Sequence, residues 1–126
     1  KMILSNGEPI KCAHSEPLAI YISGGITGVK NWQDIFMAAE QDLMLHLHAR
    51  FFIFNPVKIA KDLERSFKVN IGKMPGYTDY MREDIKILAR CNAICMLPGW
   101  KRSKGARLEY HIAKILNMQI LEFQPE

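Results

Sequence analysis

The chain has 126 residues, of which 48% are hydrophobic, 24% charged and 10% aromatic. This length and composition are those of one ordinary globular domain, and they exclude a disordered, collagen-like or coiled-coil chain. Seventeen Lys and Arg against thirteen Asp and Glu give a net charge of +4, which suits anionic small molecules but is weak for a dedicated nucleic-acid binder.

The cysteines and the lengths of the apolar runs indicate in which cellular compartment the protein works and whether it binds a metal ion. Cys12, Cys91 and Cys95 cannot all pair, and no Cys or His cluster has metal-ligand spacing. We therefore expect a reducing compartment, no metal and no other cofactor. Every apolar run is far shorter than the roughly 20 residues of a membrane helix, so we expect a cytoplasmic protein with no membrane partner.

Residues 1–17 are predicted to be an N-terminal extension, and residues 18–126 to be the domain. Asn6-Gly7, the dipeptide that type I′ turns favour, lies between the short apolar segments 2–5 and 8–12. This arrangement predicts a β-hairpin. Pro9 weakens its second strand because proline has no backbone N–H to donate.

From Leu18 onward, short apolar runs alternate with segments of helical periodicity, which is typical of a parallel sheet with crossover helices. Asn55-Pro56 ends the second strand, and Thr78 is expected to cap the third helix. The expected strands are residues 18–22, 51–54, 93–97 and 119–123, and the expected helices are residues 31–46, 57–66, 79–90 and 106–116.

This order of elements predicts an α/β fold: an open parallel sheet of the flavodoxin-like or Rossmann-like type, in the order 2-1-3-4, with helices on both faces. Such sheets bind ligands at the carboxyl ends of their strands, where the strand order reverses. Residues 23–28 follow the first strand and residues 98–105 follow the third, and both loops contain glycines. We therefore expect these two loops to share one crevice.

Glu109 lies three residues before Ile112, on the face of the last helix that should pack on the sheet. Its neighbours three and four positions away are Gly105, Ala106, Ile112 and Ala113, and none of them is a cation. An inward carboxylate without a basic partner is typical of a group that does acid–base or nucleophilic chemistry. A surface glutamate, or one that compensates the helix dipole, is the alternative.

Asp84 repeats this pattern on the preceding helix. Its neighbours three and four positions away are Tyr80, Met81, Ile87 and Leu88. Two acids that face one crevice are suited to proton transfer and to stabilisation of a cationic carbon. A structural aspartate that caps a loop is the alternative.

The loop before the last helix carries a second signal. Ser103, Lys104 and Gly105 lie at the expected helix start, where free backbone N–H groups and a hydroxyl can hold a phosphate. Neither this loop nor Gly24-Gly25-x-x-Gly28 matches a Walker or dinucleotide motif, which favours a mononucleotide-sized ligand. Structural glycines in turns are the alternative.

Five segments of the chain form a recognisable set: residues 21–28 (YISGGITG), 55–56 (NP), 80–84 (YMRED), 97–100 (LPGW) and 103–109 (SKGARLE). Together they resemble the DUF4406 family of the nucleoside 2-deoxyribosyltransferase-like superfamily, over about residues 18–121. That superfamily includes deoxynucleoside 5′-monophosphate N-hydrolases, in which a serine precedes the catalytic glutamate by six residues. Ser103 precedes Glu109 by six, which favours a nucleotide over a nucleoside.

The resemblance implies that Glu109 is a nucleophile that attacks C1′ of a ribose or deoxyribose, that Asp84 protonates the departing base and that Tyr21 orients the glutamate. It also implies a 5′-phosphate site at the two glycine-bearing loops and a contact from Asn55 to the base or sugar. Trp100 is expected either to stack on the base or to cover the sheet edge. The candidate substrate-binding residues are Gly24, Gly25, Thr27, Gly28, Asn55, Trp100, Ser103 and Gly105.

The expected activity is cleavage of the N-glycosidic bond of a (deoxy)nucleoside 5′-monophosphate. This cleavage develops oxocarbenium character, which a carboxylate can capture in a two-step displacement. The alternatives are a transferase that exchanges bases on deoxyribose and a nucleotide sensor without catalysis. The expected partners are the small-molecule nucleotide or nucleoside and, from the resemblance, further copies of the chain in a homodimer or larger homo-oligomer. Lys and Arg are scattered along the chain, so we expect no nucleic-acid partner.

Overall fold

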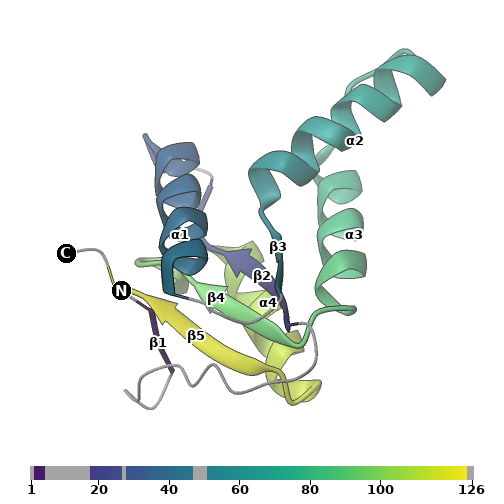
Figure 1. Cartoon of the computed structure of the whole chain (residues 1–126). Helices are drawn as coiled ribbons and strands as arrows, with labels where there is room; N and C mark the ends of the chain where they lie inside the picture. Colours follow the sequence, from purple (N-terminus) through teal and green to yellow (C-terminus); the bar gives the residue numbers. More distant parts are fainter. Residues whose placement is uncertain (1, 5–17, 27, 47–50, 125–126) are drawn as a thin grey trace.

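The computed structural model describes residues 2–4, 18–26, 28–46 and 51–124 (Figure 1). Within them, five strands form one sheet. The strands are β1 (Met2–Leu4), β2 (Leu18–Ser23), β3 (Phe51–Phe54), β4 (Ala93–Met96) and β5 (Gln119–Phe123). The described helices are α1 (Trp32–His46), α2 (Pro56–Asn70), α3 (Tyr77–Leu88) and α4 (Lys104–Ile115), with a short 3-10 helix η1 (Trp100–Arg102) before α4.

The strand order across the sheet is β1-β5-β4-β2-β3. Strands β3, β2, β4 and β5 are parallel, and counted from β2 along the chain their order is 2-1-3-4. The predicted α/β topology is confirmed. Because the chain passes from β3 at the edge to β4 on the other side of β2, the strand order reverses between β2 and β4.

β1 adds an antiparallel strand beside β5, with Met2 opposite Phe123 and Leu4 opposite Leu121. The remainder of the predicted hairpin, including Asn6-Gly7 and the second strand, lies outside the described residues. None of the described helices is long and apolar enough to cross a lipid bilayer.

Alternate residues of the central strand β2 serve two separate cores, because successive side chains of a strand point to opposite faces. Ile20 and Ile22 pack with residues of α1, such as Phe36, on one face. Tyr21 packs on the other face, where Leu88 of α3 and several α4 residues lie. The predicted helices on both faces are therefore present.

The second helix ends later in the structure than the sequence predicts. The sequence predicts that this helix ends at Ser66, but α2 continues to Asn70 because no glycine or proline occurs between Ser66 and Gly72. Gly72 has a φ of +76° and its N–H, like that of Ile71, donates to the carbonyl of Phe67. A left-handed glycine of this kind is a common helix terminator.

The starts of α3 and α4 are also earlier than predicted. Thr78 lies inside α3 rather than at its cap, because the Asp79 carboxylate accepts a hydrogen bond from the Gly76 backbone N–H at 2.9 Å. The Ser103 hydroxyl caps α4 by accepting from the Ala106 N–H at 3.2 Å, which places Gly105 within the first turn of the helix.

Gly24 allows the carboxyl ends of β2 and β4 to come close together. The Leu97 N–H donates to the Ser23 carbonyl at 2.8 Å, directly before Gly24. A Cβ added at Gly24 would lie 2.8 Å from the Leu97 Cβ, far inside van der Waals contact. Since a Cβ is fixed to the backbone, Leu97 cannot relieve this overlap by changing rotamer.

We therefore predict that Gly24→Ala destabilises the fold by about 1–3 kcal/mol through overpacking. Gly25→Ala is the matched control, since its Cβ would meet the nearest side-chain atoms at 3.4 and 3.6 Å, which are ordinary contacts. Urea unfolding of the two variants and the wild type measures the difference. Equal stability of the two variants would contradict the close approach.

Candidate active site

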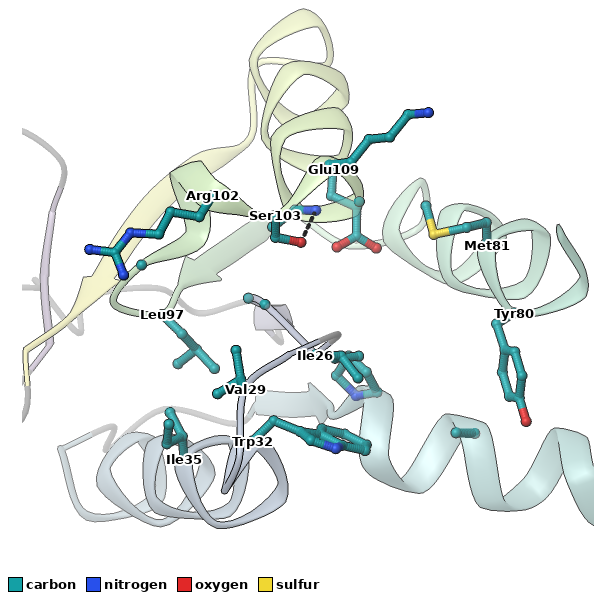
Figure 2. A pocket seen from close by; sticks show the side chains of 18 of the residues that line it. Ile26, Val29, Trp32, Ile35, Tyr80, Met81, Leu97, Arg102, Ser103 and Glu109 are labelled. Atoms are coloured by element: carbon teal, nitrogen blue, oxygen red, sulfur yellow. Dashed lines mark hydrogen bonds between the residues drawn. The ribbon is translucent and has the colours of Figure 1, made fainter. Parts of the chain in front are cut away.

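A pocket of about 960 Å³ opens at the carboxyl edge of the sheet, where the strand order reverses (Figure 2). Gly24 and Gly25 after β2 and Leu97 and Gly99 after β4 all line it, so the two glycine-bearing loops share one crevice as the topology predicts. The start of α1, the first two turns of α4 and the facing sides of α2 and α3 complete the wall. This volume suits a ligand of nucleotide size.

Glu109 projects from α4 toward this pocket and is only 5% exposed (Figure 2). The helix turns this residue inward together with Ala106 and Ala113, which pack on the same face of the sheet as Tyr21. A carboxylate at such a position loses most of its hydration and requires hydrogen-bond donors from the protein. The interpretation of Glu109 as a surface glutamate does not fit this burial.

Two hydroxyl groups of β2 supply those donors. The Tyr21 hydroxyl donates to Oε2 of Glu109 at 2.6 Å, and the Ser23 hydroxyl donates to Oε1 at 2.7 Å. Tyr21 and Ser23 are two positions apart in a strand, so both side chains point to the face that α4 covers. Each carboxylate oxygen is thereby held by one donor.

Burial and hydrogen bonding act on the pKa of Glu109 in opposite directions. Burial raises this pKa, the bonds from Tyr21 and Ser23 lower it, and burial is the larger effect. Burial, followed by the nearby charges of Glu109 and Asp84, raises the pKa of the Tyr21 phenol well above its ordinary value. Tyr21 therefore stays protonated and remains a donor to the carboxylate.

Asp84 is the second acid of the site, but it does not line the pocket. It lies on α3 one turn beyond Tyr80 and Met81, which do line the pocket. Burial, then the charge of Glu109, then that of Glu83, raises the pKa of Asp84 to about 7. An acid whose pKa is raised toward neutrality holds its proton far more than an ordinary aspartate does, which suits a general acid.

The start of α4, where a phosphate site is expected, lies close to the loop after β2 and to α3. The pocket is lined there by Ser103, Gly25 and Gly105. A Cβ at Gly25 would lie 3.6 Å from the Ser103 Cβ, and one at Gly105 would lie 3.5 Å from the Met81 sulfur. The loop after β2, the start of α4 and the inner face of α3 are therefore in close contact.

Asn55, Trp100 and Gly28 lie apart from the pocket wall that the described residues form. Asn55 is 1% exposed, and its side chain caps α2 by accepting from the backbone N–H two residues later at 3.0 Å. Trp100 stacks on Tyr110 at 4.5 Å between ring centroids and packs against the core on the α4 side of the sheet. Gly28 is exposed in a turn with a φ of +78°. Thr27 lies outside the described residues.

The structure adds residues that were not among the sequence-based candidates. Ser23 contacts Glu109, and its position two residues after Tyr21 was the signal that could have identified it. Glu64 of α2 and Tyr80 of α3 also line the pocket, joined by a hydrogen bond of 2.7 Å from the Tyr80 hydroxyl to Glu64 Oε2. The further lining residues are Ile26, Val29, Trp32, Ile35, Pro56, Ala60, Tyr77, Met81, Pro98, Arg102, Lys104 and Ala106.

The arrangement of His, Cys, Asp and Glu side chains bears on metal binding and on thiol chemistry. No three His, Cys, Asp or Glu side chains there lie close enough together to hold a metal ion. Cys91 and Cys95 are buried thiols, and burial raises the pKa of both, which disfavours the reactive thiolate.

The fold and the site together define an open parallel α/β domain with a buried carboxylate at a pocket beside its topological switch point. Residues 18–122 match the family described as Domain of unknown function (DUF4406), and the chain belongs to this family. No curated protein matches the chain, and no solved structure does either.

The two hydroxyl donors generate a prediction about the ionisation of Glu109. Ser23→Ala and Tyr21→Phe each remove one bond that stabilises the charged carboxylate, so each raises the pKa of Glu109 further. The carboxyl 13C chemical shift of Glu109, followed by NMR against pH, measures this. Ser66→Ala, an exposed serine on α2, is the control. An unchanged or lowered pKa in both strand variants would show that the bonds do not form.

Proposed function

We propose that this protein cleaves the N-glycosidic bond of a (deoxy)nucleoside 5′-monophosphate and releases a free base and a sugar phosphate. The observation that carries the proposal is Glu109, a nearly buried carboxylate held by two hydroxyl donors beside a nucleotide-sized pocket. Membership of the nucleoside 2-deoxyribosyltransferase-like superfamily, which the sequence motifs indicate, is part of the same proposal.

In the first step, a Glu109 carboxylate oxygen forms a bond to C1′ while the bond from C1′ to the base nitrogen breaks. The electron pair of the broken bond stays on the base. Asp84, which does not itself line the pocket, supplies through one water molecule the proton that makes the base a neutral leaving group. The products are a glycosyl ester on Glu109, a free base and an ionised Asp84. Hydroxyl donors that fix both Glu109 oxygens support this role, since they reduce the reorganisation that attack requires.

In the second step, water attacks C1′ and the ester bond to Glu109 breaks. Ionised Asp84 accepts the proton that the water loses, which restores the acid for the next turnover. The net reaction consumes one nucleotide and one water, and yields one base and one sugar phosphate. If a second base took the place of water, the same site would act as a transferase.

The phosphate end of the proposed site is the first turn of α4. Arg102 and Lys104 line the pocket there, next to Ser103 and the helix N-terminus. Lys101 does not line this pocket, and its ammonium lies 5.8 Å from the centre of the Trp100 ring. Positive charge beside the pocket favours a nucleotide over an uncharged nucleoside.

The main test is release of free base from a panel of nucleoside monophosphates, measured by chromatography. We expect Glu109→Gln to reduce release to near background and Asp84→Asn to slow it by about 10²- to 10⁴-fold, the usual contribution of a general acid. Saturable nucleotide binding without release by the wild type would instead support a sensor. Wild-type turnover by Glu109→Gln would contradict the mechanism.

The same assay has an expected pH dependence. Asp84 must carry a proton in the first step, so kcat/KM falls as the pH rises through about 7, the pKa of this group. Glu109 must be ionised, so kcat/KM also falls at acid pH, starting above the ordinary range of a glutamate because burial raises its pKa. Since the two charges interact, the limbs belong to the pair of acids. Asp84→Asn should lose the alkaline limb.

The phosphate end is tested separately. We predict that Arg102→Gln raises KM for a nucleoside monophosphate about tenfold, because it removes a charge-assisted contact, and leaves KM for the matching nucleoside unchanged. Lys101→Gln removes a neighbouring charge outside the pocket and serves as the control. An equal effect of the two variants on the nucleotide would indicate general charge attraction rather than a site.

We also propose that the protein is cytoplasmic, that it forms a homodimer or larger homo-oligomer, and that it has neither a nucleic-acid nor a membrane partner.

A further inference from the structure

We propose that the end of the pocket between α2 and α3 binds a base that carries an exocyclic amino group, with the Glu64 carboxylate as the hydrogen-bond acceptor. Adenine, cytosine and guanine belong to this class, whereas uracil, thymine and hypoxanthine do not. The inference rests on the proposed function, because it assumes that the ligand is a nucleotide.

Glu64 and Tyr80 form a fixed polar pair at this end of the pocket. Glu64 comes from α2 and Tyr80 from α3, both line the pocket, and the Tyr80 hydroxyl donates to Glu64 Oε2 at 2.7 Å. This bond uses one acceptor position of a carboxylate that has about four. The pair therefore holds the Glu64 side chain in place and leaves acceptor capacity for a ligand.

The charges of the pocket are separated along its length. The cationic side chains that line the described pocket are Arg102 and Lys104, both near the start of α4. At the other end, the hydrogen bond to Glu64, followed by burial and the Glu64 charge, raises the pKa of Tyr80 to about 12. Tyr80 thus remains a donor to Glu64 at neutral pH.

The order of these groups matches the order of parts in a nucleotide. Figure 2 shows Glu109 between Arg102 and Ser103 on one side and Met81 and Tyr80 on the other. With C1′ at Glu109 and the 5′-phosphate toward Arg102, the base extends toward α3 and α2. Aromatic and apolar side chains line this part of the pocket and suit a flat ring: Trp32, Tyr77, Tyr80, Ile26 and Met81.

A carboxylate distinguishes amino from carbonyl groups on a base because it can only accept hydrogen bonds. An amino group donates to Glu64, whereas a carbonyl at the same ring position places its partially negative oxygen against the carboxylate. A site built around a hydrogen bond to a ligand N–H rejects the analogue that lacks the donor. For one bond to a charged group, we expect a preference of roughly tenfold or more.

The experiment measures binding and chemistry on pairs in which one member carries an exocyclic amino group and the other does not: dCMP with dUMP, dAMP with dIMP, and dGMP with dIMP. Dissociation constants are measured by calorimetry on Glu109→Gln, which leaves the nucleotide uncleaved. Base release is measured with the protein that retains Glu109, the wild type. We expect the amino member to bind roughly tenfold or more tightly in at least one pair.

Glu64→Gln, added to both forms, should reduce that preference to within about threefold, because an amide of the same shape both donates and accepts and so tolerates either substituent. Asp62→Asn is the matched control: it removes an acid of α2 that is 78% exposed and outside the pocket, and it should keep the preference. Thermal unfolding confirms that the variants are folded.

The outcomes separate this inference from the proposed function. Equal affinities in every pair, preference for the member that lacks the amino group, a preference that survives Glu64→Gln, or no binding of any of these nucleotides would overturn the inference. Base release without an amino preference would overturn it and leave the proposed function standing. An amino preference in binding that depends on Glu64, without base release from any nucleotide, would support the inference and overturn the proposed activity.

Discussion

The burial of one carboxylate between two strand hydroxyls is the constraint on which the rest of the site depends. Glu109 is almost fully buried, and burying an ion is unfavourable unless hydrogen bonds replace its water. The hydroxyls of Tyr21 and Ser23 meet this requirement at 2.6 and 2.7 Å. They can do so because β2 is a central strand whose alternate side chains face α4, and because α4 packs small residues such as Ala106 against that face. A shift of one residue in β2 would turn both hydroxyls to the opposite core.

Most of the fold could be predicted from the sequence because its signals are local. Apolar runs of four or five residues mark the strands, helical periodicity marks the crossovers, and the alternation of the two fixes a parallel sheet. The inward direction of Glu109 follows from the same periodicity. Ser23 does not stand out in the sequence because the two glycines that follow it indicate a turn, although β2 continues through it. Thr78 was chosen as a cap by residue type, while the capping bond in the structure comes from Asp79.

The far end of the pocket could not be predicted, because it depends on how two helices pack. Glu64 and Tyr80 are 16 positions apart, and nothing in the local pattern of either helix indicates that their side chains meet. The length of α2 matters too, since a helix stopped at Ser66 would have placed Glu64 in its fraying last turn. Asn55 illustrates the reverse case: a polar residue at a suggestive position whose side chain is already used to cap α2. The position of a residue in a motif therefore does not distinguish a side chain that lines the pocket from one that caps a helix.

The pocket draws its walls from two kinds of element, and they differ in how freely their residues can be exchanged. Tyr21 and Ser23 belong to the interior of the sheet, so any replacement there also alters a core. Glu64, Tyr77 and Tyr80 stand on helices at the rim, where they are partly or largely open to solvent. Substitutions at the rim can therefore change which ligands the pocket accepts while Glu109 and its two hydroxyl donors stay in place. This makes α2 and α3 the natural targets for directed evolution of ligand choice.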